Sequence, residues 1–214
     1  MQDHPFPKVS DPYQYRAIGI VRGTYIPQNE ESFTRGSLID SDGVEIDAVL
    51  LGRVIALTRK HINIKSPHLW VVYPRCREMD NLHLQISGVW EPSTLSGDNF
   101  DSEAKNDLNE KFFDEIPEGD EYFSIRGELI YSKPENNDLV VKIRQMPRSQ
   151  VKKPIPFKLL LKGNIPLEKI RNFVNLDVRR KGQQLHLENY EIVGALPSSG
   201  SKKKIRAKAQ ARNT

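Results

Sequence analysis

Residues 122–131 read Tyr-Phe-Ser-Ile-Arg-Gly-Glu-Leu-Ile-Tyr, and this stretch is the strongest indication of the fold. Alternation of apolar and polar side chains is typical of a β-strand with one buried face. Residues 139–144 repeat the alternation after a turn-rich segment, so we expect a second strand to pair back on the first. The positions expected to face inward are Phe123, Ile125, Leu129, Tyr131, Leu139, Val141 and Ile143.

The rest of this C-terminal half continues the pattern. A third strand is predicted at residues 157–162, with Phe157 inward, and it ends at Gly163. A short helix is expected after Pro166, because proline suits the first turn of a helix. A fourth strand then leads into a basic turn, and a fifth begins near residue 185. Its parity breaks near Asn189, which predicts a β-bulge.

The N-terminal half has the same order of elements. Strands are expected near residues 15–26, 34–40 and 44–51, followed by an amphipathic helix at 53–61 and strands near 68–74 and 82–90. Residues 41–43, Ser-Asp-Gly, supply a hairpin turn between the second and third strands. The closing segments 81–86 and 184–189 also resemble each other. We therefore predict a diverged internal duplication.

Three strands, a helix and two further strands is the order of the oligonucleotide/oligosaccharide-binding, or OB, fold. Each half resembles that superfamily over roughly 80 residues, which implies a mainly β protein with two five-stranded barrels, each with a helix between its third and fourth strands. The stretches 33–38, 67–75 and 123–129 are also similar to an uncharacterised family of cyanobacterial proteins, which carries no established activity. The expected organisation is a first OB-like domain at 12–95, an acidic linker at 96–121, a second, basic OB-like domain at 122–195 and a basic disordered tail at 196–214.

Charge is divided unevenly along the chain. The net charge is −1 for residues 1–95, −8 for 96–121 and +13 from residue 122 onward, and residues 201–214 hold six basic side chains and no acidic one. Basic tracts concentrate where a chain meets a polyanion. We therefore expect a nucleic-acid-binding protein. RNA is favoured over single-stranded DNA, by analogy with the short basic extensions of ribosome-associated proteins. There are two alternatives. The tail could serve only solubility, and the Lys and Arg side chains on the strands could simply face solvent or protect strand edges without binding a partner.

Strand parity and loop position identify the candidate contacts. Because barrels of this kind use loops and outer faces to follow a nucleic-acid backbone, phosphate contact should dominate and sequence specificity should be weak. Aromatic side chains of outward parity are candidates for stacking on bases: Tyr122, Phe173 and Tyr190. The candidate phosphate ligands are Arg126, Lys142, Arg144, Arg148, Lys152, Lys153, Lys158, Lys162, Arg179, Arg180, Lys181, Lys202, Lys203, Lys204 and Arg206.

Two regions leave alternatives open. The acidic segment 96–121 is either a solvated linker or an anionic strand that competes with RNA for the basic domain. In the nearly neutral first domain, Trp70 and Trp90 are expected to pack in the core. That domain either supports the second or docks a protein partner, so a protein–protein adaptor or assembly factor is the alternative function.

Other classes lack support in the sequence. Cys76 is the only cysteine, so no intramolecular disulfide or cysteine-based zinc finger can form. The five histidines are scattered, and no phosphate-binding glycine loop or nucleophile elbow is present. We therefore expect no enzyme activity, no cofactor and no metal. The absence of a long apolar run or a signal-peptide pattern predicts a cytoplasmic protein without a membrane partner.

Overall fold

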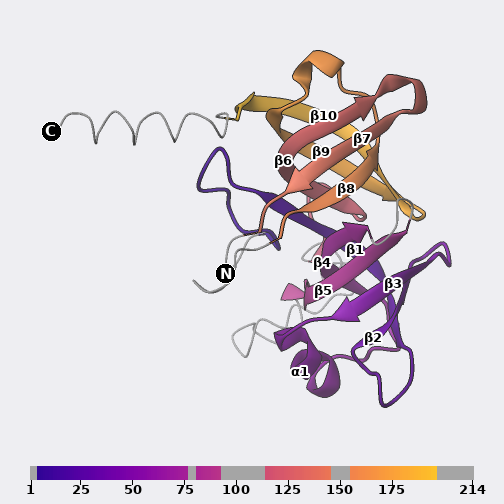
Figure 1. Ribbon diagram of the computed structural model, residues 1–214. Helices are drawn as coiled ribbons and strands as arrows, with labels where there is room; N and C mark the ends of the chain where they lie inside the picture. Colours follow the sequence, from indigo (N-terminus) through magenta and orange to yellow (C-terminus); the bar gives the residue numbers. More distant parts are fainter. Residues whose placement is uncertain (1–3, 77–80, 93–113, 146–154, 197–214) are drawn as a thin grey trace, which may run out of the picture.

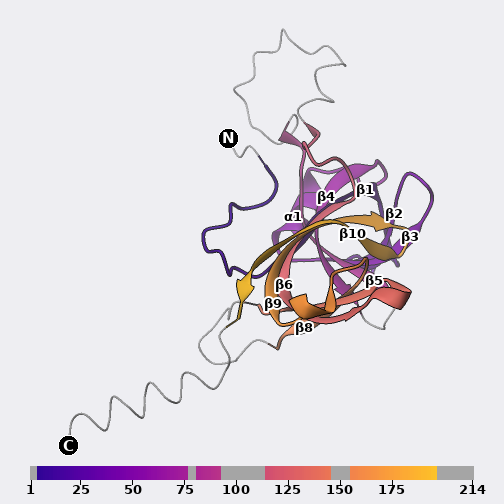
Figure 2. The same ribbon diagram turned by 90° about the horizontal axis from the view of Figure 1, so that it is seen from above.

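The computed structural model describes residues 4–76, 81–92, 114–145 and 155–196. These residues form two β-barrels that lie against each other, the first in indigo to magenta and the second in orange to yellow (Figures 1 and 2). The first contains β1 (Arg16–Pro27), β2 (Arg35–Ile39), β3 (Glu45–Leu50), α1 (Arg53–Lys60), β4 (His68–Cys76) and β5 (Leu82–Val89). The second contains β6 (Tyr122–Lys133), η1 (Pro134–Asn136), β7 (Asp138–Ile143), β8 (Phe157–Lys162), η2 (Leu167–Lys169), β9 (Asn172–Lys181) and β10 (Gln184–Ala195).

Both barrels close in the strand order of an OB fold. In the first, β1 pairs with β2 and β4, β2 with β3, and β5 lies antiparallel to β4 and parallel to β3. The second repeats this order, with β6 pairing to β9 and β10 lying parallel to β8. The predicted mainly β fold with two OB barrels is confirmed. The helical segment between the third and fourth strands is α1 in the first barrel, and in the second it is only the short 3₁₀ turn η2.

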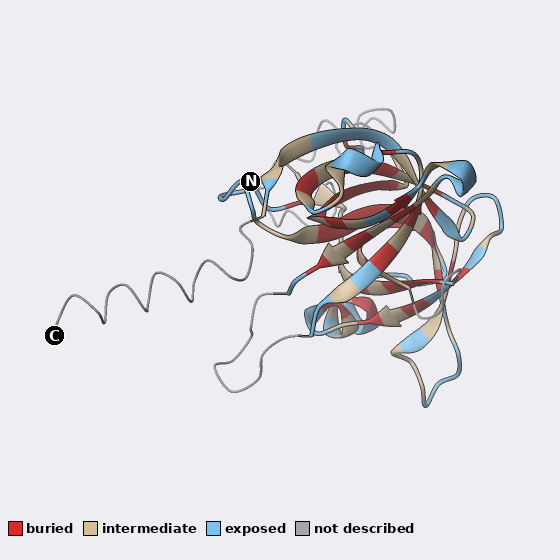
Figure 3. Ribbon diagram, turned by 45° about the horizontal axis from the view of Figure 1, so that its top comes forward, coloured by how far each residue is buried: buried red, intermediate tan, exposed pale blue. Residues whose placement is uncertain are grey.

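Alternating apolar side chains fill the barrels, as Figure 3 shows by the buried residues along the strands. Leu139, Val141 and Ile143 of β7 are all buried, and so is Trp70 of β4, as predicted. Tyr131 was predicted to face inward, and that prediction is wrong, because its side chain is 44% exposed. A register shift between Leu129 and Tyr131 marks a β-bulge, which reverses the parity of the residues that follow it.

An Arg-Gly pair recurs in the first strand of each barrel, at residues 22–23 and 126–127. A Cβ atom on Gly23 would lie 2.5 Å from the Ile39 carbonyl oxygen, and one on Gly127 would lie 2.7 Å from the Lys142 carbonyl oxygen. At both places the first strand passes so close to the second that only glycine fits. The matching position of these two glycines agrees with the predicted duplication. The predicted bulge near Asn189 is also present, as a register shift between Leu187 and Asn189.

A strand pairing joins the two barrels. β1 and β6 run antiparallel, with Gly19 opposite Phe123 and Arg16 opposite Arg126, so the ten strands form one hydrogen-bonded sheet. A Cβ atom on Gly19 would overlap the Phe123 ring, so this close approach requires a glycine. The junction is therefore built from main-chain hydrogen bonds and tight packing.

Two further segments pack across this junction. Residues 114–121, the described end of the predicted linker, bury Ile116, and Asp120 pairs with Arg22 at 2.5 Å. The N-terminal segment 4–15, in indigo in Figure 1, runs beside the second barrel before it enters β1. In the described part of the chain, no helix has the length and apolar character needed to cross a membrane.

Candidate nucleic-acid interface

The outer surface of the second and third strands of the second barrel carries a row of paired positions. β7 and β8 are antiparallel, with Lys142 opposite Lys158, Val140 opposite Leu160 and Asp138 opposite Lys162. The intervening residues of both strands point into the core, so these six side chains share the outer surface. We call the six positions the β7–β8 face. Arg144 follows β7 directly and lies at the same end as Lys142.

Cations exceed carboxylates on this face and its flank. Lys142 Nζ lies 3.2 Å and Arg144 Nη2 lies 3.6 Å from the same carboxylate oxygen, Oε2 of Glu128. Lys162 Nζ donates to Asp138 Oδ1 at 2.7 Å. Lys158 is exposed, and no carboxylate among the described residues lies within salt-bridge distance of it. The balance is positive, because two carboxylates oppose four cations.

The positive potential extends to the neighbouring strand β10. His186 pairs in register with Lys162, and Lys181 is exposed near the start of the same hairpin. Burial lowers the pKa of His186, and the charges of Lys181 and Lys162 lower it further. The part of this pKa shift that each lysine causes is smaller than the part caused by burial, and both lysines place positive charge near the ring.

Two of the predicted phosphate ligands are buried, so the prediction that they lie on the outer surface is wrong. Arg126 is 7% exposed, and its guanidinium donates to the carbonyl oxygen of Pro12 at 2.6 Å because the N-terminal segment crosses over it. The side chain of Arg180 is 3% exposed and forms ion pairs with Asp40, at 2.6 Å, and with Glu121. Both arginines hold parts of the molecule together.

Arg179 is also engaged within the protein. Its guanidinium forms an ion pair with Glu188 at 3.0 Å and donates to the carbonyl oxygens of Glu118, at 2.9 Å, and Asp120, at 2.6 Å. These bonds attach the segment before β6 to β9. Among the predicted ligands described in the structure, Lys142, Arg144, Lys158, Lys162 and Lys181 are the ones that remain on or beside the cationic surface.

The predicted stacking residues do not form a platform. Phe173 is fully buried and Tyr122 is 8% exposed, so the prediction that their rings are exposed for stacking is wrong. The N-terminal segment covers them: Phe6 stacks on Tyr122 at a centroid distance of 5.9 Å, and Tyr13 packs edge-on against Phe173 at 5.5 Å.

Tyr190 is 37% exposed on β10, as outward parity predicts. Its neighbours are acidic, however, since Glu191 follows it in the chain and Asn189, which precedes it, donates to Asp177 at 3.5 Å. Carboxylates repel a phosphate backbone, so this surface is a poor place for RNA.

The remaining candidates Arg148, Lys152, Lys153, Lys202, Lys203, Lys204 and Arg206 lie outside the described residues. Residues 146–154 connect β7 to β8, so in the sequence they join the strand ends that carry Lys142 and Lys158.

The corresponding surface of the first barrel has the opposite character. Glu45 and Asp47 project from β3, where Ser37 donates to Glu45 at 2.5 Å and His83 Nδ1 lies 2.9 Å from Asp47. These side chains line a groove together with Asn81 and Gln183. Two carboxylates on the third strand of the first barrel make this surface unsuited to phosphate.

Sequence reasoning missed the carboxylates that partly neutralise the cationic face. Glu128 neutralises part of the charge of Lys142 because the two residues lie directly opposite each other in the β6–β7 pairing. Counting from the intervening turn would place Leu129 opposite Lys142, because the bulge between Leu129 and Tyr131 shifts the register by one residue. Only the attraction between opposite charges on neighbouring strands could have suggested the pair. Within residues 4–76, 81–92, 114–145 and 155–196, no three His, Cys, Asp or Glu side chains group as a metal site would require.

Two closed OB barrels, with a cationic outer face on the second, place the chain in the class of tandem OB-fold proteins. Residues 17–97 match the family model described as PatR RNA-binding protein, N-terminal OB-fold domain, and residues 125–194 match the one described as cyanobacterial OB-fold-like RNA-binding domain, C-terminal. The chain belongs to this cyanobacterial family of OB-fold proteins, and the two matches coincide with the two barrels. No curated protein matches the chain.

Proposed function

We propose that the protein binds single-stranded RNA through the β7–β8 face of its second barrel, and that it acts by binding rather than by catalysis. The observation that carries the proposal is the charge excess on this face, where Lys158 has no carboxylate partner in the described structure. OB folds use the surface of their second and third strands for oligonucleotides, and β7 and β8 are those strands here.

Backbone phosphates are the chemical groups that this face is suited to bind. Lys142 and Lys158 form a cationic end, Lys162 and its partner Asp138 form the other end, and Val140 and Leu160 lie between them. The six positions hold no aromatic side chain, and the exposed ring of Tyr131, opposite Val140 on β6, borders them, so base stacking is confined to that flank. We therefore expect weak sequence preference and a steep dependence of the affinity on salt.

The choice of RNA rests on the descriptions of the two matching families, both of which name RNA. Single-stranded DNA offers the same phosphates, so it should bind through the same face, more weakly. The basic segments 146–154 and 201–214 would add phosphate contacts. A bacterial cytoplasm is the compartment in which we expect this binding, and a protein partner on the first barrel is the alternative function.

The double variant Lys142→Ala/Lys158→Ala tests the proposal. Each phosphate contact adds about 0.7 to the slope of log Kd against log salt for single strands, or about fivefold in affinity at 0.1 M salt. Two contacts would give about 25-fold. Because Glu128 already partly neutralises Lys142, we expect about tenfold weaker RNA binding.

The matched control is Lys60→Ala/Lys65→Ala, which removes two exposed lysines from the first barrel. Fluorescence anisotropy with an unstructured RNA, and with DNA of the same sequence, would measure both double variants. A chain ending at Gly200 would separate the contribution of the tail. Equal affinities for both double variants and the unaltered protein would reject the β7–β8 face as the RNA site.

A further inference from the structure

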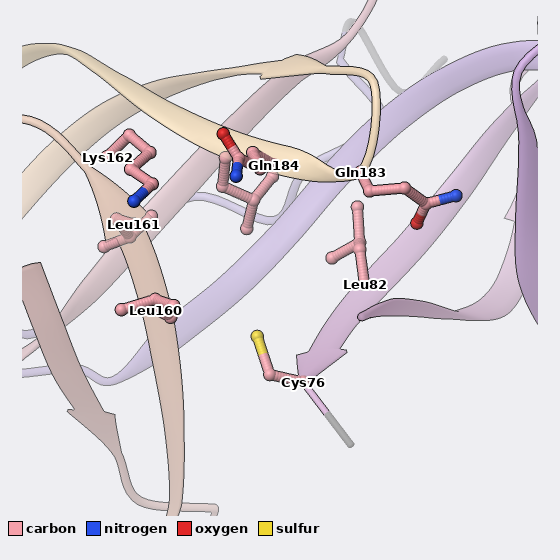
Figure 4. Close-up of a pocket in the computed structure, with 8 residues that line it drawn as sticks. Cys76, Leu82, Leu160, Leu161, Lys162, Gln183 and Gln184 are labelled. Atoms are coloured by element: carbon pink, nitrogen blue, oxygen red, sulfur yellow. The ribbon is translucent and has the colours of Figure 1, made fainter. Parts of the chain in front are cut away.

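Arg75, near the end of β4 in the first barrel, reaches the second barrel. Its guanidinium carbon lies 3.9 Å from the ring centroid of Phe157, the first residue of β8. Cation–π contacts are attractive within about 6 Å, so this is a close one. β4 and β8 pack against each other, and the hollow between the barrels beside this contact is lined by Cys76 and Leu82 on one side and Leu160 and Lys162 on the other (Figure 4).

Within the described part of the chain, no carboxylate neutralises the charge of Arg75. Two other arginines at the barrel junction have carboxylate partners: Arg22 pairs with Asp120, and Arg180 with Asp40 and Glu121. Arg126 donates to main-chain carbonyl oxygens instead, and Arg16 to a carbonyl oxygen and the Ser124 hydroxyl. In the described residues, Arg75 has no carboxylate within salt-bridge distance, and its Nη1 donates to the neighbouring Pro74 carbonyl oxygen at 2.8 Å. Burial lowers the pKa of Arg75, so an anion beside its guanidinium would be stabilising.

Arg75 lies near the end of β8 at which Lys158 stands, although Phe157 and Lys158, as successive residues of the strand, point to opposite sides of β8. Phe157, on which its guanidinium rests, directly precedes Lys158, and Lys158 lies opposite Lys142. A contact with the ring uses none of the guanidinium N–H donors, and apart from the bond from Nη1 to Pro74 those donors suit the geometry of a phosphate. The β1–β6 pairing holds the two barrels together, so the distance between Arg75 and Lys158 does not depend on a flexible connection.

We infer that Arg75 and Lys158 together bind a backbone phosphate of RNA, so that one strand crosses from the second barrel onto the first at this junction. The inference rests on the proposed function, because it extends the same RNA site. Sequence analysis missed Arg75 because the first half of the chain is nearly neutral, and only the packing of β4 on β8 brings it to the site.

The variant Arg75→Gln tests the inference, and Arg59→Gln is its matched control. Arg59 likewise lies above a phenylalanine, with its guanidinium carbon 5.1 Å from the Phe33 centroid, but it is exposed and lies on α1. Loss of one phosphate contact should weaken RNA binding about fivefold at 0.1 M salt and reduce the salt slope by about 0.7. Arg59→Gln should bind as the unaltered protein does.

A second measurement uses the unaltered full chain, so it does not depend on the folding of a variant. Phenylglyoxal modifies accessible arginines, and mass spectrometry gives the extent at each position. Bound RNA should protect Arg75 and leave Arg59 equally reactive. If Arg75→Gln binds normally and Arg75 stays reactive, while Lys142→Ala/Lys158→Ala binds weakly, the inference fails and the proposed function stands. If the lysine variant also binds normally, both fail.

Discussion

Replacing Arg180 by alanine should strongly destabilise the fold. The side chains of Arg180 and Asp40 are only 3% and 5% exposed, and that of Glu121 is 21% exposed. Without the guanidinium, two carboxylates face each other in a largely buried place. Removing one partner of a buried ion pair costs about 3–5 kcal/mol. Because Glu121 retains some solvent, we expect a loss of about 3 kcal/mol in the free energy of unfolding at pH 7.

The destabilisation should depend on pH. In the unaltered protein, burial opposes ionisation of Asp40, but hydrogen bonds from Arg180 and from the Val44 N–H outweigh it, so the pKa is lowered. This carboxylate therefore contributes stability above its unfolded pKa, and that stability is lost as the pH falls through the folded pKa. In the variant, burial and mutual repulsion should raise both carboxyl pKa values, so protonation at low pH relieves the repulsion.

Urea unfolding of Arg180→Ala and the unaltered protein, at pH 7 and pH 4.5, measures both effects. The difference between the two proteins should be largest at pH 7 and should shrink at pH 4.5. Lys181→Ala is the control, since it removes the exposed neighbouring cation. A difference below about 1 kcal/mol at pH 7, the range of an exposed pair, would refute the reasoning.

Two further predictions concern the junction and the cationic surface. Gly19→Ala should lower stability by about 1–3 kcal/mol because its methyl group would overlap the Phe123 ring. Gly88→Ala, where an added Cβ would have its nearest neighbour at 3.8 Å, should be nearly neutral, and equal melting temperatures for the two variants would contradict this. RNA should raise the pKa of His186, which burial and the nearby lysines depress, because a polyanion favours the charged ring. NMR titration with and without RNA measures this pKa, and an unchanged value would place the RNA away from β10.

Much of the fold could be predicted from local sequence patterns. Alternation in β7 predicted that Leu139 and Val141 point inward, and both are buried. The same parity placed Lys142 and Lys158 on the outer surface, where the structure has them opposite each other. These predictions succeeded because successive side chains of a strand point to opposite faces of the sheet whatever its neighbours are. Parity failed at Tyr131, where a bulge shifts the register.

Interactions between distant segments decided which outward-pointing side chains are covered and which are exposed. Arg126 and Phe173 have the parity of surface residues, yet the N-terminal segment covers both of them. Arg180 stands in a basic turn of the sequence, yet Asp40, 140 positions away, pairs with it. Strand periodicity contains no information about which remote segment will cover an outer surface, because that depends on the packing of the whole chain.

The sequence by itself determined two OB barrels and a C-terminal half rich in cations, because strand order and charge are properties of the chain that need no knowledge of distant contacts. Only the tertiary structure decided which cations face solvent and which hold the barrels together. It also brought Arg75 of the first barrel onto Phe157 of the second. The physical reason is that a charged side chain is placed by its partners, and those partners come from remote parts of the chain.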